Sequence, residues 1–303
     1  MISEAVVQAL RGFVPAENIC LQEPMALHTT FKVGGPADCL IALENEEQLQ
    51  KVQRYLHLVG IPFFVLGNGS NVLVSDRGFK GIILQIGDKM NEVEVDGRRV
   101  TAQAGARMSQ VARVAMEHGL TGLEFASGIP GTIGGGVVMN AGAYGGEMKQ
   151  VVETVTVVNQ EGELLELDNA TMEFGYRYST IRNQPFVVTK VTFLLEEGDS
   201  AQIKLTMDDL AAKRREKQPL EYPSAGSTFK RPEGYFAGEL IMKTGLRGFR
   251  IGGAQVSEKH CGFVINAGNA SAADIMDLIQ EVRSRVKDKF NVELEPEVIF
   301  LGF

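Results

Sequence analysis

The stretch GLEFASGIPGTIGGGVVMNAGAYGG, residues 122–146, decides how this sequence folds around a ligand. It places Gly128, Gly131 and the run 134–136 within a few residues of Ser127 and Thr132. Backbone without side chains can approach a ligand closely, and successive N–H groups can form an anion-binding nest. This density of glycine therefore indicates a loop that wraps a pyrophosphate, with a plain interdomain connection as the alternative.

A shorter glycine tract, VLGNGSNVLVSD, covers residues 65–76. The apolar run 61–67 predicts a strand that leads into a turn at 67–71, where the backbone could again meet an anion. Neither tract is followed by Gly-Lys-Ser/Thr, so neither is a Walker A loop. No good helix pattern follows 131–134, which disfavours a Rossmann dinucleotide-binding fingerprint. Two such tracts favour a phosphate-bearing cofactor.

Composition narrows the class of protein. The chain has 303 residues, of which 44% are hydrophobic, which is enough for two or three domains. The formal net charge is −8 without a basic cluster, so we expect no nucleic-acid partner. Cys20, Cys39 and Cys261 are far apart, which disfavours disulfides and zinc and fits a reducing compartment. Without a long apolar run or a signal peptide, we expect a cytoplasmic protein with no membrane partner.

Hydrophobic periodicity predicts the elements of the fold. Helix patterns occur at 1–13, 45–60, 108–119, 205–220 and 270–291. Strand patterns occur at 61–67, 81–87, 92–105 (a hairpin turning at Asp96-Gly97), 153–159, 163–168, 185–198, 249–255, 262–268 and 294–303. The elements are interspersed without regular alternation, so an α+β fold with mixed sheets is favoured over a doubly wound one. We expect boundaries near 80 and near 200.

The C-terminal third holds most of the candidate catalytic residues. Only four histidines occur, and both a GxSxG elbow and a metal-ligand cluster are missing, so any catalysis would run through a cofactor. Ser227 lies in the turn-rich YPSAGSTFKRP (222–232), and Glu295 and Glu297 share one face of the predicted last strand. Arg177 lies between two tyrosines. Ordinary loop, surface-acid and solvated-arginine roles are the alternatives.

Four segments together resemble the FAD-binding half of UDP-N-acetylenolpyruvoylglucosamine reductases: HTTFKVGGPAD (28–38), GNGSN (67–71), SGIPGTIGG (127–135) and NAGAYGGE (140–147). The resemblance implies the two-subdomain flavin fold of vanillyl-alcohol oxidase and p-cresol methylhydroxylase. It also implies FAD-binding subdomains at 1–80 and 81–200, a substrate domain at 201–303, and non-covalent FAD. The residues it assigns to FAD are Val33, Gly34, Gly35, Gly67, Asn68, Gly69, Ser70, Asn71, Ser127, Gly128, Ile129, Pro130, Gly131, Thr132, Gly134 and Gly135.

The resemblance extends to the other candidates. It implies that Ser227 donates a proton, that Arg177 and Glu297 polarise the substrate, and that Lys230, Lys259 and His260 belong to the substrate site. The reaction implied is NADPH-dependent, FAD-mediated reduction of UDP-N-acetylglucosamine enolpyruvate to UDP-N-acetylmuramate, for peptidoglycan. The short spacing from Arg177 to Ser227 resembles the compact variety of the family, which lacks an extra substrate-covering loop.

Two other functions remain open from the residues. An oxidase of small alcohols could use the same flavin fold, but it would have no reason to carry both AGSTFK and LEPEV. A non-catalytic flavin or nucleotide-sugar binder would tolerate loss of Ser227, Arg177 or Glu297, and all three are present.

Overall fold

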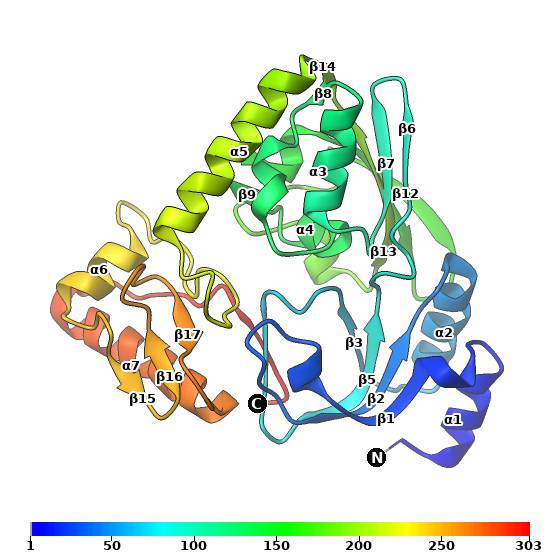
Figure 1. Cartoon of the computed structure of the whole chain (residues 1–303). Helices are drawn as coiled ribbons and strands as arrows, with labels where there is room; N and C mark the ends of the chain where they lie inside the picture. The colour runs from blue at the N-terminus through cyan, green and yellow to red at the C-terminus, as the bar shows by residue number, and fades with distance from the viewer. Residues whose placement is uncertain (1) are drawn as a thin grey trace. The chain divides into compact units, whose positions relative to one another are not determined.

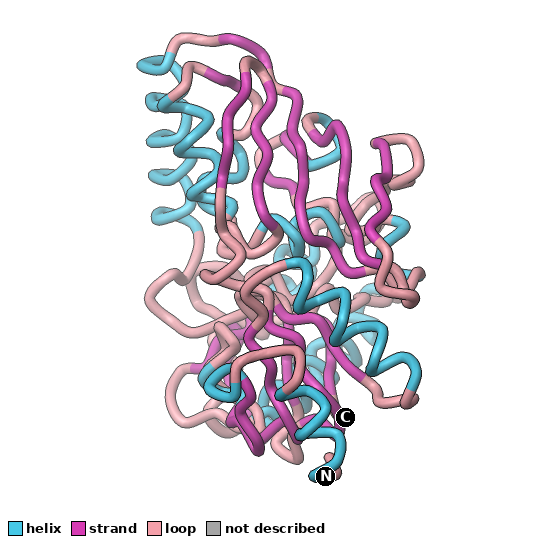
Figure 2. Tube along the Cα trace, turned by 90° about the vertical axis from the view of Figure 1, so that its right-hand side faces the viewer, coloured by secondary structure: helices cyan, strands magenta, loops and turns pink. Residues whose placement is uncertain are grey.

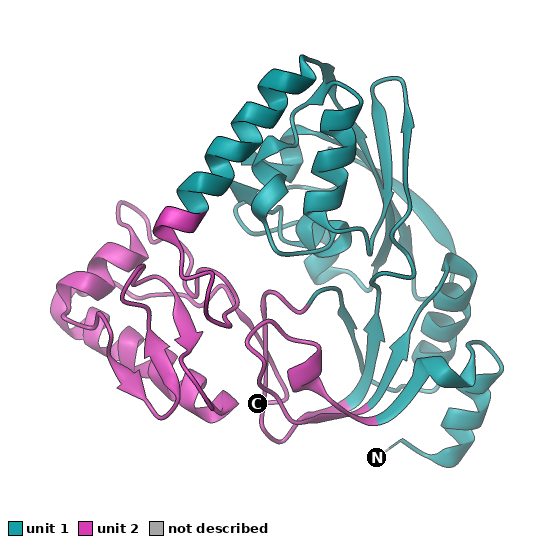
Figure 3. Cartoon of the chain, viewed as in Figure 1, with its two compact units in different colours: residues 1–21, 39–68, 81–214 teal, residues 22–38, 69–80, 215–303 magenta. Residues whose placement is uncertain are grey.

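The computed structural model describes residues 2–303 and forms two compact units, each assembled from separate segments (Figure 3). Unit 1 contains the chain up to Leu21, then Cys39–Asn68 and Gly81–Arg214. Unit 2 contains Gln22–Asp38, Gly69–Lys80 and Arg215–Phe303. The sequence predicts three contiguous domains with boundaries near 80 and 200, and that division stays a prediction.

Most predicted elements are present, within a few residues of their expected ends (Figure 1). The α-helices are α1 (Glu4–Arg11), α2 (Glu46–Leu58), α3 (Met108–Glu117), α4 (Ile133–Val138), α5 (Ser200–Lys217), α6 (Ala237–Lys243) and α7 (Ala272–Phe290). The strands are β1 (Ile19–Pro24), β2 (Pro36–Ala42), β3 (Phe63–Leu66), β4 (Val72–Val74), β5 (Phe79–Gln85), β6 (Val93–Asp96), β7 (Arg99–Gln103), β8 (Leu120–Thr121), β9 (Gly142–Ala143), β10 (Gly146–Glu147), β11 (Val152–Val158), β12 (Leu164–Asp168), β13 (Val187–Leu194), β14 (Glu196–Glu197), β15 (Arg250–Ile251), β16 (Ala254–Val256), β17 (Val264–Asn266) and β18 (Ile299–Leu301). Among the described residues, no helix is long and apolar enough to cross a membrane.

The main sheet of unit 1 has five antiparallel strands in the order β12-β11-β13-β7-β6, which run side by side in Figure 2. Val155, Val191 and Ala102 pair across the three central strands, and all three side chains are fully buried. Helices α3 and α4 both contact β7 and cover this face. The predicted hairpin at Asp96-Gly97 is confirmed, because Gly97 takes the positive φ of +56° that such a turn needs.

A second sheet, in the order β1-β2-β5-β3, contributes the strand ends that reach the site. Strands β3 and β5 are parallel, with Phe63 opposite Ile82 and Leu66 opposite Gln85. Parallel strands end at the same edge of a sheet, so Gly67 after β3 and Gly87 after β5 are brought to one side. Helix α2 follows β2 and starts at the N-cap Asn45, whose side chain accepts a hydrogen bond from the Gln48 amide.

Unit 2 has its own apolar core, built between helix α7 and the antiparallel strands β15-β16-β17. Ser271 is the predicted N-cap of α7, and the structure confirms it as part of a capping box with Asp274. Asp76 accepts hydrogen bonds from the next two amides, those of Ala272 and Ala273, at 2.9 Å each. The start of α7 is therefore held by carboxylates, which the helix dipole favours.

Two sequence expectations were wrong. Only 299–301 of the predicted last strand are extended in a ladder, as β18 paired in parallel with β4, so Glu295 and Glu297 do not share a strand face. Pro296 breaks the pattern because it lacks an N–H, and it makes only an isolated bridge with Phe229. In addition, the glycines at 134–136, which do not look helical in sequence, lie in the six-residue helix α4.

Asp274 generates a prediction about stability. Its carboxylate accepts hydrogen bonds from the Ser271 amide (3.0 Å) and the Gly253 amide (3.1 Å), and these lower its pKa below the ordinary 3.8. Asp274→Asn should therefore reduce the free energy of unfolding by about 0.5–2 kcal/mol at neutral pH, as for other helix-start contacts. A group with a lowered folded pKa stabilises above its unfolded pKa. Denaturant titrations of both proteins should thus converge as the pH falls below about 4; a constant gap down to lower pH would contradict the role.

Candidate functional site

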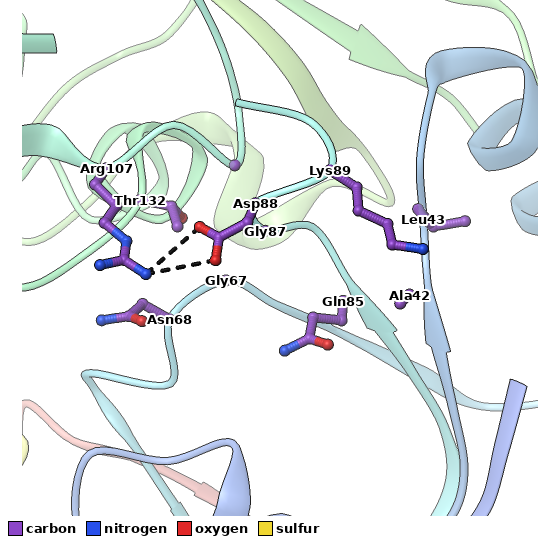
Figure 4. Close-up of a pocket in the computed structure, with 11 residues that line it drawn as sticks. Ala42, Leu43, Gly67, Asn68, Gln85, Gly87, Asp88, Lys89, Arg107 and Thr132 are labelled. Carbon is purple, nitrogen blue, oxygen red and sulfur yellow. Dashed lines mark hydrogen bonds and ion pairs between the residues drawn. The ribbon is translucent and has the colours of Figure 1, made fainter. Parts of the chain in front are cut away.

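Unit 1 contains a pocket of about 230 Å³ where its two larger sheets and the start of helix α4 meet. Figure 4 shows Asn68, Arg107 and Thr132 towards one end and Lys89 and Leu43 towards the other. The lining residues are Ala42, Leu43, Gly67, Asn68, Gln85, Gly87, Asp88, Lys89, Gly105, Arg107 and Thr132. Gly67, Asn68 and Thr132 come from the two glycine tracts, so the structure brings these tracts together here, as the sequence predicts for a common ligand.

Close packing explains several of the glycines around this pocket. A Cβ on Gly67 would lie 2.3 Å from Thr132 Oγ1, and one on Gly105 would lie 2.1 Å from the Gly87 carbonyl oxygen. A Cβ on Gly134 would lie 2.9 Å from Ala104 Cβ. At Gly87, in contrast, a Cβ would meet nothing within 4 Å and φ is not positive. The protein fold does not require a glycine at 87, so the open space beside it is available to a bound group.

The amides near the pocket fall into two groups. The first two amides of α4, at Ile133 and Gly134, donate to the carbonyls of Ala106 and Ala104. Among residues 2–303, the amides of Asn68, Thr132 and Gly135 have no such acceptor. Asn68 and Gly135 are exposed, so their amides can bond to water, and together with the Thr132 amide they are available to a ligand.

Charged side chains at the rim are paired with one another. Arg107 lies 3.5 Å from Asp88, as the dashed lines in Figure 4 show. Lys89 Nζ lies 2.7 Å from the Glu44 carboxylate. The neighbouring Asn18 side chain, and next the hydrogen bond from Lys89, lower the pKa of Glu44 to about 2. Lys89 is thus engaged with a carboxylate that stays ionised.

The rest of the second tract is held by hydrogen bonds within unit 1. Ser127 Oγ donates to the Glu124 carbonyl at 2.8 Å. Gly128 lies against Arg214, whose guanidinium donates to the carbonyls of Gly128 and Phe125. Arg214 is 7% exposed, and burial lowers its pKa. It therefore fixes the turn that precedes Ile129 and Pro130.

The remaining residues assigned to FAD by resemblance lie in unit 2: Val33, Gly34, Gly35, Gly69, Ser70 and Asn71. Here packing explains the glycines, because a Cβ on Gly35 would lie 2.1 Å from the Asp76 carbonyl and one on Gly69 would lie 2.0 Å from the His28 carbonyl. Val33 is buried in the core of unit 2. The Asn71 amide group donates to the Glu297 carbonyl at 3.1 Å.

Backbone contacts in unit 2 bring together the segment that carries Ser227 and Lys230 and the segment that carries Glu297. Thr228, which is fully buried, accepts a hydrogen bond on its carbonyl from the Glu297 amide at 2.8 Å. The Lys230 amide donates to the Glu295 carbonyl at 2.9 Å, and the side chains of Lys230 and Glu295 form an ion pair. The Ser227 side chain, one residue before Thr228, is exposed and open to a ligand.

Thr228 also ties this pair of segments to the third predicted one, 248–268. Its Oγ1 accepts a hydrogen bond from the Val264 amide at 2.9 Å, and its amide donates to the Gly262 carbonyl at 2.8 Å. Burial lowers the pKa of His260, and its Nδ1 accepts from the Gly262 amide, so the neutral ring carries its proton on Nε2. Lys259 Nζ donates to the Arg215 carbonyl at 2.7 Å.

Arg177 lies in unit 1, at the tip of a tight turn. Gly175 and Tyr178 exchange both backbone hydrogen bonds, at 3.0 and 3.2 Å, and enclose Tyr176 and Arg177. Arg177 has a φ of +55°, and its guanidinium stacks on the Tyr176 ring at 5.1 Å. The three predicted catalytic residues are thus divided, with Arg177 in one unit and Ser227 and Glu297 in the other.

Comparisons with known proteins agree with this organisation. A protein 49% identical over 301 residues, from Caldanaerobacter subterraneus subsp. tengcongensis, is a UDP-N-acetylenolpyruvoylglucosamine reductase, and the match covers 99% of both chains. The reductase of Clostridioides difficile is 51% identical over 97% of this chain and 96% of its own. This chain belongs to the UDP-N-acetylenolpyruvoylglucosamine reductase family. The crystal structure of the Thermus caldophilus reductase aligns with a TM-score of 0.81 at 34% identity, over 93% of this chain and 98% of that one.

Family models match two separate parts of this reductase-family chain, and more distant structures share its fold. Residues 37–168 match an FAD binding domain, and residues 218–301 match the C-terminal domain of UDP-N-acetylenolpyruvoylglucosamine reductase. A glucose dehydrogenase, Phl p 4.0202, shares the fold with a TM-score of 0.51 at 16% identity, over 64% of this chain and 44% of that one. The predicted α+β fold of the vanillyl-alcohol oxidase and p-cresol methylhydroxylase type is confirmed.

Several residues at these sites were missed in the sequence of this reductase-family member. Gly87, Gly105 and Arg107 line the pocket but stand outside the glycine-rich tracts. A usable signal is present, since each glycine stands shortly after a strand, as Gly67 does, but a local pattern cannot show that the three strand ends meet. Thr228 was missed because the sequence argument for the 222–232 segment considered only Ser227 as a hydroxyl donor.

Thr228 generates a prediction about the unit 2 cluster. Thr228→Val keeps the shape but removes the acceptor of the buried Val264 amide, and leaving such a donor unpaired costs about 1–3 kcal/mol. Denaturant unfolding should show that loss. Thr244→Val, which removes a helix-surface hydroxyl bonded to the Leu240 carbonyl, serves as control and should change stability by less than about 0.5 kcal/mol. Equal effects of both changes would mean that Thr228 has no special structural role.

Proposed function

We propose that this protein reduces the enolpyruvyl group of UDP-N-acetylglucosamine enolpyruvate to give UDP-N-acetylmuramate, with FAD as cofactor and NADPH as reductant. This is a step of peptidoglycan precursor synthesis, and we place it in the cytoplasm, where free thiols such as those of Cys39 and Cys261 persist. The observation that carries the proposal is the pocket at which both glycine tracts meet in a member of this reductase family. We expect no nucleic-acid or membrane partner.

The pocket fits part of an FAD molecule. The open space at Gly87 and the amides of Asn68, Thr132 and Gly135 offer room and N–H donors for a phosphate-bearing group. The residues proposed to hold FAD are those that the resemblance assigns in the 33–35, 67–71 and 127–135 segments. To these we add Gly87 and Arg107, which line the same pocket. Among the described residues that line it there is no cysteine or histidine, which favours non-covalent binding.

When bound, FAD supplies hydride transfer from NADPH to C3 of the enolpyruvyl group. Addition at C3 leaves negative charge on C2 that spreads into the substrate carboxylate. We assign Arg177 to that carboxylate, because its planar guanidinium can present two parallel donors to the developing charge. Glu297 assists by donating a hydrogen bond in its neutral form or by orienting a partner.

Ser227 completes the reaction by delivering a proton to C2. Its exposed hydroxyl follows Gly226, whose φ of +73° and lack of neighbours within 4 Å leave the turn accessible. A serine hydroxyl is a weak acid, so this transfer requires a strongly basic carbon and exact placement. We assign Lys230, Lys259 and His260 to the rest of the substrate, since all three are linked to the same segments as Ser227.

The cofactor assignment is tested by two matched glycine changes. Gly87→Ala should fold normally, because its Cβ meets nothing in the chain, yet weaken FAD binding at least about tenfold by filling the space of the ligand. Gly134→Ala should instead lower the melting temperature of the FAD-free protein, because its Cβ would lie 2.9 Å from Ala104 Cβ. Thermal unfolding and FAD titration measure both. Acid precipitation should leave all flavin in the supernatant. Wild-type FAD affinity in Gly87→Ala would exclude this pocket.

The role of Ser227 is tested by separating the two half-reactions. Ser227→Ala should leave reduction of bound FAD by NADPH intact, and it should slow the substrate-driven reoxidation by about 10²–10⁴-fold, the range of general acid catalysis. Stopped-flow absorbance of the flavin follows each half-reaction. Equal losses in both would point instead to a role of Ser227 in folding or flavin binding. Wild-type rates in both would remove Ser227 from the mechanism.

A further inference from the structure

The turn that carries Arg177 is held in an unusual conformation. A φ of +55° is uncommon for arginine, and such conformations persist only where the surroundings impose them. The carbonyl of Arg177 accepts a hydrogen bond from Arg182 at 2.8 Å. On either side of it, two further side-chain hydrogen bonds tie the turn to the end of helix α4. One comes from Asn140 and the other from Ser179.

Asn140 is fixed in place by the way helix α4 ends. Its amide donates to the Val137 carbonyl, and the Ala141 amide donates to the Gly136 carbonyl at 2.7 Å. These two bonds, with the left-handed φ of +42° at Asn140, form a Schellman motif. Asparagine tolerates this conformation better than most residues, and here it is 1% exposed. The backbone position therefore explains an Asn or Gly, but not the side-chain contacts.

Those contacts leave a single orientation for the Asn140 side chain. Its Oδ1 accepts a hydrogen bond from the Lys149 amide at 2.9 Å, so its Nδ2 must face the two acceptors on the other side. They are the Gly175 carbonyl at 3.0 Å and the Glu147 carboxylate at 3.1 Å. The Asn140 side chain thus accepts one hydrogen bond through Oδ1 and donates two through Nδ2. Gly175, which accepts one of them, lies two residues before Arg177.

Ser179 holds the other side of the turn. It is fully buried, and its hydroxyl donates to the Val138 carbonyl at 3.0 Å, which is one of the terminal carbonyls of α4 left without a helical partner. The residues two before and two after Arg177 are therefore both fastened to the end of the same helix. The start of that helix, at Thr132, lines the pocket that we propose for FAD.

We propose that Asn140 is a positioning residue for Arg177. It sets the place of the guanidinium relative to helix α4, and so relative to the cofactor loop at the start of that helix. This inference rests on the proposed role of Arg177 at the substrate carboxylate. In this proposal Asn140 touches neither substrate nor cofactor, and it acts on Arg177 only through its hydrogen bond to the Gly175 carbonyl.

The test uses Asn140→Asp, which keeps the size, the left-handed conformation and the acceptor for the Lys149 amide. It replaces the donor to Gly175 by an oxygen, so the turn loses this anchor. Reduction of FAD by NADPH should be unchanged, whereas substrate-driven reoxidation should fall by about 10²-fold, as expected when a reacting group is displaced by about 1 Å. Stopped-flow absorbance measures both rates. Wild-type reoxidation would overturn the inference.

Asn159→Asp is the matched control. Asn159 is also buried, its Oδ1 accepts from the Glu163 amide at 2.8 Å, and its Nδ2 donates to the Glu163 carboxylate at 3.0 Å. The change thus places one carboxylate beside another in the same unit, away from the Arg177 turn, and reoxidation should stay at the wild-type rate. If Asn140→Asp does not fold, adding Glu147→Gln removes the like charge while the donor to Gly175 is still missing. That double variant should then show the same slow reoxidation.

A double-mutant cycle separates this inference from the proposed function. Arg177→Lys should slow reoxidation by itself, because lysine lacks the planar pair of donors. In that background Asn140→Asp should add little, since residues that act through one another are not additive. Full additivity would show that Asn140 acts by another route. If Arg177→Lys reoxidises at the wild-type rate, the proposed role of Arg177 fails first, whatever Asn140→Asp does.

Discussion

The pocket of unit 1 depends on close packing between chain segments that only glycine permits. Gly67, which follows strand β3, lies against the Thr132 side chain, and Gly134 in helix α4 lies against Ala104, which follows strand β7. Methyl groups at these places would force the segments apart, because packed interiors have little spare volume. The first amides of a helix have no acceptor within the helix, and here those of Ile133 and Gly134 find acceptors at Ala106 and Ala104, whereas those of Thr132 and Gly135 find no backbone acceptor among residues 2–303. The packing thus determines which of these amides stay available.

Local pattern was sufficient for most elements of the fold. Alternating apolar residues predicted β6, β7 and the turn between them. The N-cap Ser271 and the apolar face of the following residues predicted α7. Both signals arise from contacts between residues that are near in sequence. It failed at 294–298, where an apolar alternation looks like a strand but Pro296 and the short partner β4 limit pairing. It also failed at α4, where glycine hides a helix that tertiary contacts stabilise.

The candidate site was only partly accessible from the sequence. Motif order led to Gly67, Thr132, Ser227 and Glu297, since these stand in recognisable segments. Gly87 and Arg107 become part of a site only when three strand ends converge, which no local pattern encodes. The same holds for Asn140, whose partner at Gly175 lies far along the chain. Its motif, NAGAYGGE, was associated with the cofactor, whereas its asparagine contacts the turn of Arg177.

The parallel pairing of β4 with β18 sets an order on biosynthesis. All segments of unit 1 precede residue 215, so the ribosome delivers them before unit 2 is complete. Residues 72–74 are synthesised early, but their pairing partners at 299–301 are synthesised last. The Leu301 carbonyl that accepts a hydrogen bond from the Ser75 amide is likewise among the last groups to be made. During synthesis, the apolar side chains of Phe31 and Leu73 therefore lack the core that later buries them. We therefore expect apolar side chains around 31 and 73 to be exposed until the C-terminal third is made, and transiently exposed apolar surface favours aggregation.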